Sequence, residues 1–548
     1  MADEVPVLVE PHQVIVGPPP PGCPECLRTR RLAAAGPDEA ALIDTAAASS
    51  LTTFAADLVI ALTDAATDPT RCWIVDTGSF HTSRHAFLPD PRCTTCSSAP
   101  PDSAGAAIVL PRRRPKLSPG SSRVRELDGP ALAKTYVDGR AGLITAVNSY
   151  TQHAFPFSEA VLAVPGEEPA TGHGRTRDFA SAWRISVVEA LERSAAYGPS
   201  AKRTSVVASY DEVRDHALDP RSFGLYPPDR YRTPGFPYRP FTEDAVTSWV
   251  WGYSFSRQCP VLVPEGHVYY RMPRPPDDRR FAAEISSGCA LGGCYEEAVL
   301  HGLLEIAERD AFLLAWYGRL PLPEIDLDTV EDDRIALVAE RIALRGHRVR
   351  VFDTTREHGV PSFWALAEDV VGGDRPKTAS TGGSGLDPAE AVLAALHELC
   401  QTVEYVALMA LDPGWLDRAR RLADNPAEVT TMADHLLCAA NPGTVDRFSF
   451  LLDGARTVPW QQARRRWDWP ANDDIGTDLA EAVTRFADAG LEVVAVDMTS
   501  AEHRAGEFRC VKVIVPGSVP MTFGHSSRRV TGLPRLPEVR NPFPHPFP

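Results

Sequence analysis

Three glutamates lie close together on one side of a predicted helix that is otherwise apolar. In the segment SSGCALGGCYEEAVLHGLLEIAER (286–309), Glu297, Glu305 and Glu308 fall within about 80° of one another around the helix axis. Carboxylates in an apolar setting need partners, and a divalent metal ion is a common one. The alternative is a partly exposed helix whose acidic edge pairs with Arg309, and this helix alone does not decide between the two.

Two further segments repeat the acidic pattern. SVVEALER (186–193) places Glu189 and Glu192 one turn apart on an apolar helix. A third predicted helix begins with Asp387 as its N-cap and a proline at its first position. Its polar residues within about one third of the circumference are Glu390, His397, Glu398 and Gln401. Three such helices lining one cleft would hold Mg²⁺, which takes oxygen ligands and substrate phosphates.

Two glycine-rich stretches, GHGRT (172–176) and STGGSG (380–385), indicate turns where the backbone can approach a phosphate group closely. The chain carries neither a Walker A sequence nor the set of protein-kinase motifs. If ATP binds, we therefore expect it in the acidic, metal-rich cleft rather than in a P-loop.

Four cysteines form two CxxC pairs, Cys23 with Cys26 and Cys93 with Cys96. Two thiolates at this spacing reach one tetrahedral ion, so two pairs predict a closed four-sulfur site with about one structural Zn²⁺ per chain. The alternative is that one pair is redox-active or simply buried. The other seven cysteines are scattered along the chain, and we interpret them as core residues.

The composition limits the class of protein. The chain has 548 residues and a formal net charge of −16, which argues against non-specific binding to nucleic acid or to anionic membrane surfaces. The acidic N-terminus lacks the features of a signal peptide, and no apolar run reaches transmembrane length. We expect a cytoplasmic protein whose thiols stay reduced, without a disulfide framework.

The chain divides into three parts. Residues 1–100 form a small unit of short strands and one helix near 51–65, and residues 101–130 are a Pro/Ser/Arg-rich linker. Residues 131–548 are an α/β region that ends in the extended tail NPFPHPFP. Its clearest predicted elements are helices at 184–197, 295–317 and 388–409 and strands at 347–353, 491–497 and 510–516.

Several motifs, in this order, resemble the YcaO family of ATP-dependent enzymes that modify peptide backbones. They are GHGRT (172–176), SVVEALERSAAY (186–197), the segments 286–312, 382–402 and 496–520, and the tail NPFPHPFP. The resemblance runs from about Arg123 to Pro548. It implies the YcaO fold, an α/β arrangement of mixed sheets with packed helices. The proline-rich end is similar to that of the azoline-forming cyclodehydratases.

Carried over to this sequence, the resemblance implies specific roles. Magnesium ligands would be Glu189, Glu192, Glu305 and Glu308. Nucleotide contacts would come from Ser186, Glu297, Arg309, Glu398 and Gln401, and the catalytic tail positions would be Pro544, Pro546 and Pro548. The chain departs from the family pattern at Ile185, His173 and Ala394, which weakens the expected grip on phosphate unless a lysine or arginine comes from elsewhere.

The implied reaction condenses a Cys, Ser or Thr side chain of a peptide with the preceding backbone carbonyl. The amide oxygen takes the γ-phosphoryl group of ATP and leaves as phosphate, which gives a thiazoline or oxazoline. His545 and His301 are candidate bases by chemistry only, and a packed or solvated histidine is the commoner case. Thioamide or amidine formation is a second possibility, against which the proline-rich end argues. A non-catalytic scaffold is a third.

The N-terminal unit resembles the tail of the ThiF-like partner proteins of these cyclodehydratases, in GCPECLRTRRLAA (22–34) and RHAFLPDPRCTTCSS (84–98). Those partners carry a leader-peptide-binding domain in front, for which there is no room before Cys23. The resemblance therefore implies a ribosomally made precursor peptide, a separate ThiF-like leader-binding protein, a flavin dehydrogenase and a homodimer as partners.

Overall fold

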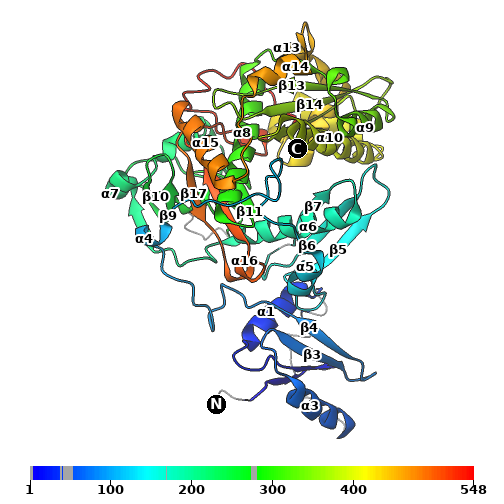
Figure 1. Cartoon of the computed structure of the whole chain (residues 1–548), viewed down its shortest axis with the longest axis vertical. Coiled ribbons are helices and arrows are strands. Elements are labelled where there is room, and N and C mark those ends of the chain that lie inside the picture. The colour runs from blue at the N-terminus through cyan, green and yellow to red at the C-terminus, as the bar shows by residue number, and fades with distance from the viewer. Residues whose placement is uncertain (1–3, 37–39, 41–52, 168, 273–279, 548) are drawn as a thin grey trace.

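The N-terminal unit contains a small antiparallel sheet and lies at one end of the molecule (Figure 1). The computed structural model describes residues 4–36, 40, 53–167, 169–272 and 280–547. The strands pair in the order β1 (Val7–Val9), β2 (Gln13–Val16), β3 (Arg71–Asp76) and β4 (Thr82–Ala86). The helices are α1 (Pro24–Ala34) and α3 (Thr53–Ala65). The first two residues of the helix predicted at 51–65 lie outside the described residues.

Buried polar contacts join this unit to the rest of the chain. Arg30 of α1 forms an ion pair with Glu502, and the two side chains are 2% and 7% exposed. His85 lies 3.0 Å from the carboxylate of Asp138. An unpaired buried charge is costly, so the Arg30–Glu502 pair keeps the unit docked rather than loosely tethered.

The connecting segment (residues 101–125) is packed along the larger region. It contains the short helix α4 (Ala104–Ala107). Asp102 accepts the backbone N–H of Trp251 at 2.8 Å, and the buried Lys116 ammonium pairs with Asp478. Its Pro/Ser/Arg composition predicts a linker, and these long-range contacts, which cannot be read from composition, hold the segment against the larger region.

A three-stranded antiparallel sheet carries the first acidic helix. It consists of β5 (Ile144–Tyr150), β6 (Phe157–Leu162) and β7 (Ala170–Arg175), with α5 (Gly129–Tyr136) and α6 (Phe179–Ser194) packed beside it. GHGRT is therefore mostly strand, and its prediction as a turn is wrong. A Cβ on Gly172 or Gly174 would lie 2.3 Å or 1.8 Å from a backbone oxygen of α6, so these glycines permit close strand–helix packing.

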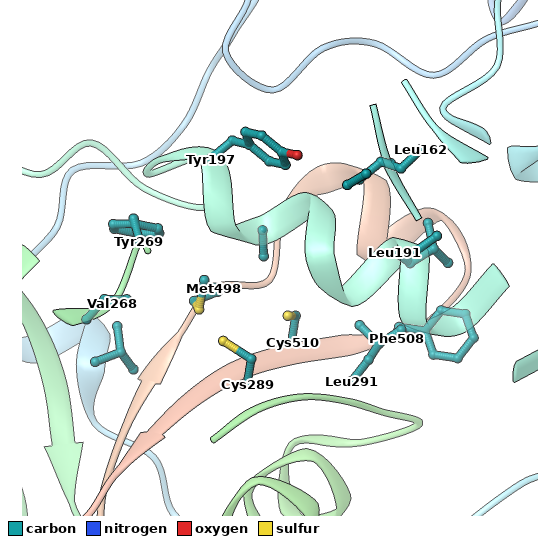
Figure 2. Packing of buried hydrophobic residues seen from close by; sticks show 14 of the residues in the cluster. Leu162, Leu191, Tyr197, Val268, Tyr269, Cys289, Leu291, Met498, Phe508 and Cys510 are labelled. Carbon is teal, nitrogen blue, oxygen red and sulfur yellow. The ribbon is translucent and has the colours of Figure 1, made fainter. Parts of the chain in front are cut away.

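A six-stranded sheet forms the centre. Its order is β10 (Cys259–Pro264), β9 (Val246–Ser254), β17 (Val494–Asp497), β18 (Arg509–Ile514) and β11 (Cys289–Gly292), with β8 (Val206–Ser209) beside β9. Figure 2 shows Leu191 of α6 and Tyr197 gathered with Cys289 and Cys510 from this sheet and with Met498, which directly follows β17, all members of one buried cluster. None of the eleven cysteines forms a disulfide in the described residues.

The third layer is a five-stranded sheet in the order β15 (Thr378–Ser384), β14 (Ser362–Asp369), β13 (His347–Asp353), β12 (Glu324–Asp326) and β16 (Thr457–Pro459). Beside it lie α9 (Asp333–Ala343), α10 (Pro388–Met409), α11 (Trp415–Asp424) and α12 (Met432–Ala440). By length and apolar composition α10 could cross a membrane, but here it packs on β14, β15 and α9 as a core helix. STGGSG lies mainly in β15, so this predicted turn is also a strand.

Helix α8 (Tyr295–Gly318) runs between the six-stranded and five-stranded sheets and contacts both. It packs against α15 (Ile475–Asp488), and α16 (Ala501–Ala505) precedes β18. The remaining short helices are α7 (Tyr210–Val213), α13 (Ser449–Leu452) and α14 (Trp460–Ala463). The predicted helices at 295–317 and 388–409 and the strand at 347–353 are confirmed.

The C-terminal tail passes into the interior of the molecule beside α8 (Figure 1). The amides of Arg540 and Asn541 donate to the carbonyl of Tyr317 at 2.8 and 2.9 Å. The Trp316 indole donates to the carbonyl of Phe543 at 3.2 Å. The tail has neither helix nor strand over 541–547, as its prolines predict, and Phe547 at its end is 1% exposed.

Candidate active site

The first two acidic helices meet at strand β11. The backbone N–H of Leu291 donates to Glu192 of α6 at 3.2 Å, and that of Gly288, just before the strand, donates to Glu305 of α8 at 3.0 Å. One short stretch of backbone therefore holds carboxylates from two helices that are more than one hundred positions apart.

Strand β15 brings the third helix to the same place. A Cβ on Gly382 would lie 2.9 Å from the Cγ of Glu308, so only glycine leaves room for that carboxylate. Glu398 of α10 lies near enough for its charge to raise the pKa of Glu308. Arg175 at the end of β7 lies 3.7 Å from Glu398. It brings positive charge to the side of α10 where the sequence has Ala394.

Two carboxyl groups of this cluster have raised pKa values. Burial, together with the charges of Glu305 and Glu189, raises the pKa of Glu192 to about 8. Burial and the charges of Glu398 and Glu305 raise the pKa of Glu308 to about 8 in the same way. The cluster therefore holds more negative charge than its arginines balance, and this is the environment that a divalent cation would relieve.

The carboxylates are spread out rather than focused on one point. Glu189 accepts the N–H of His173 at 2.6 Å and pairs with Arg193, while Glu305 pairs with Arg309 at 2.9 Å. Within the described residues, no three of these carboxylates have ligand atoms that all lie within 4.8 Å of one another. The donor set fits oxygen-seeking Mg²⁺ at more than one position, with oxygen ligands still to come from a substrate.

A cavity of about 800 Å³ opens beside Glu305 and Glu308. The start of α10 forms one wall and the connecting segment another. Residues that line it but that sequence reasoning did not single out include Lys116, Ser122, Arg123, Trp467, Trp469 and Asn472. No sequence motif marks these residues, because they belong to segments whose composition is that of linkers and loops.

None of the five predicted nucleotide contacts, Ser186, Glu297, Arg309, Glu398 and Gln401, is among the residues that line this cavity. Glu297, 1% exposed, accepts the guanidinium of Arg123 at 3.1 Å and the N–H of Val124 at 2.9 Å, so it holds the connecting segment in place. The Ser186 hydroxyl is fully buried and donates to the carbonyl of Trp183 at 2.8 Å. Contact of Glu297 or Ser186 with a nucleotide stays a prediction.

Arg309 stands beside the carboxylate cluster, and Gln401 lies on α10 one turn beyond Glu398. The Arg309 guanidinium bonds Glu305 and lies 5.6 Å from the centre of the Phe547 ring. The Gln401 side-chain oxygen is buried without a hydrogen-bond partner among the described residues. The tail thus reaches the arginine that stands beside the carboxylate cluster.

The predicted tail positions and candidate bases are also placed by the structure. Pro544 and Pro546 are buried, and Pro548 lies outside the described residues. His545 is fully buried and its Nε2 lies 2.9 Å from the carbonyl of Thr522. His301 lines the large cavity, with Nε2 at 2.9 Å from the carbonyl of Ser122, and burial together with the charge of Arg123 lowers its pKa to about 4.

The four cysteines come together as the sequence predicts. Their sulfur atoms all lie within 4.8 Å of one another, with Cys23 and Cys93 3.9 Å apart and Cys26 and Cys96 3.3 Å apart. A tetrahedral site with Zn–S bonds of about 2.3 Å needs sulfurs about 3.8 Å apart. Burial acts to raise the pKa of Cys93, but the amides of Thr95 and Cys96 and the other thiols bring it down to about 7. The set fits a structural Zn²⁺.

A family model, that of the ATP- and Mg²⁺-binding YcaO cyclodehydratases, matches residues 173–519. The chain belongs to the YcaO family. The matched part of this YcaO protein contains all the glutamates of the cluster and the helices α8, α10 and α15, which contribute residues to the wall of the large cavity. The predicted cofactors ATP and Mg²⁺ therefore agree with the family. The N-terminal unit, the connecting segment and the tail lie outside the match.

Solved structures show the same fold for the YcaO protein. A heterocyclase in complex with substrate and cofactor superposes with a TM-score of 0.74 at 21% identity, over 99% of this chain and 77% of the other. The heterocyclase TruD superposes with a TM-score of 0.67 at 19% identity, over 97% and 73%. The predicted α/β fold with packed helices is confirmed, including the N-terminal unit that these matches cover.

A sequence relative comes from Methanothermobacter thermautotrophicus and is described only as an uncharacterized protein. It is 30% identical over 233 residues, which is 42% of this YcaO protein and 56% of the relative. The chain thus matches little more than half the length of that relative.

Proposed function

We propose that the protein is an ATP-dependent cyclodehydratase that converts Cys, Ser or Thr residues of a ribosomally made peptide into azolines. The observation that carries the proposal is the cluster of glutamates from α6, α8 and α10, which opens into a cavity of about 800 Å³ beside a buried tail. A structural ion-pair network gives no reason for a carboxyl group with a pKa near 8, that of Glu308, to line a large open cavity, or for a second one, that of Glu192, to lie in the same cluster.

The glutamates Glu189, Glu192, Glu305 and Glu308 would hold Mg²⁺, because oxygen donors suit that ion. When bound, Mg·ATP supplies the phosphoryl group that turns the amide oxygen of the peptide into a good leaving group. Among the protein's own residues, Lys116 and Arg123 bring positive charge to the cavity wall, and Arg175 brings it to α10. These cations offset the absence of basic residues at His173 and Ala394.

The tail residues shape the inner end of the site. Phe547 packs against Phe312, with ring centres 4.8 Å apart, and covers Arg309. The buried prolines Pro544 and Pro546 keep the chain extended and offer no amide N–H to compete for the peptide carbonyl. The tail thereby excludes water from the side of the carboxylate cluster that faces Arg309, which strengthens the electrostatic interactions there.

The proposal also covers the partner proteins and the cellular location. We infer a separate ThiF-like protein that captures the leader peptide, a flavin dehydrogenase that oxidises the azolines, and a homodimeric enzyme. A cytoplasmic location accords with the eleven free cysteines.

One reconstitution tests the function. The protein is incubated with ATP, Mg²⁺, the precursor peptide from the neighbouring gene and its ThiF-like partner, and the peptide is then weighed. We expect loss of the mass of one water per ring, together with peptide-stimulated release of phosphate. Phosphate release without loss of water from the peptide would contradict azoline formation.

A non-catalytic scaffold is the second candidate, and the departures at Ile185 and Ala394 favour it. Ile185 is 36% exposed one turn before Glu189, on a helix face where a polar group would help to bind phosphate. Calorimetry with Mg·ATP separates the two, because a scaffold that has lost its phosphate contacts would show no binding.

A further inference from the structure

The tail alternates between prolines and residues that are individually held. Asn541, Phe543, His545 and Phe547 occupy every second position between the prolines. The amide of Asn541 donates to the carbonyl of Tyr317, and the carbonyl of Phe543 accepts from the Trp316 indole. Both partners belong to α8, so the first half of the tail is fixed to that helix.

The second half is held by a histidine on another helix. The Nδ1 of His435, in α12, lies 2.7 Å from the carbonyl oxygen of His545. The rings of the two histidines stack at 4.1 Å with 22° between their planes. His545 in turn makes its Nε2 hydrogen bond to Thr522, on the chain that leads into the tail.

The hydrogen bonds of His435 fix its protonation. The backbone N–H of Gly524 donates to Nε2 of His435 at 3.1 Å, so that nitrogen is an acceptor. Nδ1 must then carry the only proton, and it donates that proton to the carbonyl of His545. A single neutral tautomer satisfies both contacts, and burial, which lowers the pKa of His435 to about 4, favours that neutral form.

Helix α12, which carries His435, is itself held in place by hydrogen bonds. The Thr378 hydroxyl of β15 donates to the carbonyl of Ala439 at 2.7 Å, which ties α12 to the strand that carries Gly382. Asp434 accepts both the amide and the hydroxyl of Thr431 in a capping box at the start of the helix. His435 therefore connects the tail to the same strand that positions Glu308.

Two residues beyond the held carbonyl, Phe547 reaches the candidate active site. A Cβ on Gly382 would lie 2.8 Å from the Phe547 ring and 2.9 Å from Glu308, so the ring and the carboxylate share the space above one glycine. A shift of the tail at His545 would move Phe547 away from Arg309 and this glycine.

We propose that His435 is a positioning residue, which locks the tail at His545 and thereby places Phe547 against Arg309. This inference rests on the proposed function in one respect, that the tail matters for cyclodehydration. His435 itself lines neither the large cavity nor the carboxylate cluster.

Two variants at one position test the role. His435→Phe keeps a ring that can stack on His545 but removes the donor to its carbonyl. His435→Asn keeps a donor close to the place of Nδ1. We expect His435→Phe to speed amide hydrogen exchange at Phe543, His545 and Phe547 by about tenfold or more, which is the loss of one buried hydrogen bond. His435→Asn should retain most of the protection.

The enzymatic expectation is a loss of turnover without a loss of nucleotide binding. His435→Phe should lower kcat for ring formation by about tenfold while the Kd for Mg·ATP changes less than about twofold, and His435→Asn should recover most of the rate. His435→Phe should add nothing further in a protein that lacks residues 545–548, because both changes act through the tail.

The outcomes separate the two proposals. Unchanged tail exchange in His435→Phe, or losses of rate that multiply with the truncation, would overturn the positioning role. If the unaltered protein forms no rings, the proposed function fails. The exchange measurements and the ring ¹⁵N signals of His435 then still decide whether His435 holds the tail at His545. A folded His435→Asn that exchanges as fast as His435→Phe would also count against it.

Discussion

The two groups of candidate metal ligands in this protein are built in opposite ways. The four cysteines come from two short motifs, and their sulfur atoms all lie within 4.8 Å of one another. The glutamates come from three helices in different layers, and each is already held by an arginine or a backbone N–H, as Glu189, Glu192 and Glu305 show. The first group is closed, and the second opens into a large cavity.

The difference reflects what each site has to do. A closed tetrahedral thiolate site has no position left for a substrate and so contributes to folding. In the spread carboxylate cluster, burial and mutual repulsion raise the pKa values of Glu192 and Glu308, so near neutral pH these groups are protonated until an incoming cation offsets their charge. Local spacing builds each half of the first site, and the fold of one small unit joins the two halves, whereas the second site needs three helices from different layers.

The largest expected effect comes from Glu308. Its carboxylate lies on the cavity side of the cluster, so Glu308→Gln should lower peptide-dependent ATP hydrolysis by at least about 100-fold, since a metal ligand is lost. Phosphate release checks this. Glu481→Gln on α15, where the carboxylate pairs with the nearby Arg485 and does not line the cavity, is the matched control and should retain activity. Equal activity of Glu308→Gln and the control would remove the carboxylate cluster as the catalytic site.

Disruption of the four-cysteine site should lower the stability of the protein. Cys93→Ser should abolish bound zinc and lower the melting temperature, because metal binding contributes several kcal/mol or more to folding such units. Elemental analysis and a thermal melt measure both quantities. Cys72→Ala is the control, since Cys72 is buried in the same unit without belonging to the cluster, and it should keep its zinc. A metal-free protein that melts no lower than the native one would contradict the zinc assignment.

Fold stability and Mg²⁺ binding at the carboxylate cluster should depend on pH. In the metal-free protein the raised pKa values of Glu192 and Glu308 mean that the protonated forms stabilise the fold. That stability is fully present below the ordinary carboxyl pKa and is lost as the pH rises toward about 8. Mg²⁺ should therefore raise the melting temperature more above pH 8 than at pH 6, and should release protons when it binds near neutral pH.

Proton release is measured by calorimetry in two buffers of different ionisation enthalpy. Glu308→Gln should reduce the number of protons released, because one titrating group is gone. Magnesium binding that releases no protons at pH 7 would show that these carboxyl groups are not its ligands.

The smallest expected effect concerns the connecting segment. Arg123→Gln should weaken Mg·ATP binding by about three- to tenfold, the usual range for one partly exposed charged contact. If Glu297 acts only by holding Arg123, then Glu297→Gln should add little in the Arg123→Gln background. Additive losses of ATP affinity would instead support direct contact between Glu297 and the nucleotide.

Local signals made some elements predictable and others not. The helix at 388–409 has an acidic N-cap and a proline at its first position, and the structure begins the helix at that point. The glycines of GHGRT led to the prediction of a turn, but most of the segment is a strand. Glycine is favoured both where the backbone must turn and where a strand packs closely on a helix, so its presence alone does not distinguish the two. Likewise, nothing in the composition of residues 101–125 distinguishes a free linker from one that is bonded to Glu296 and Glu297.

The sequence by itself determined the four-cysteine site, the acidic faces of three helices and the family, because these depend on residue types at short, fixed spacings. Only the tertiary structure decided that the connecting segment walls the large cavity, that Glu297 bonds this segment, and that His435 holds the tail beside Arg309. Those contacts join residues about one hundred or more positions apart. Their partners are set by how the layers pack, and a one-dimensional pattern carries no record of that.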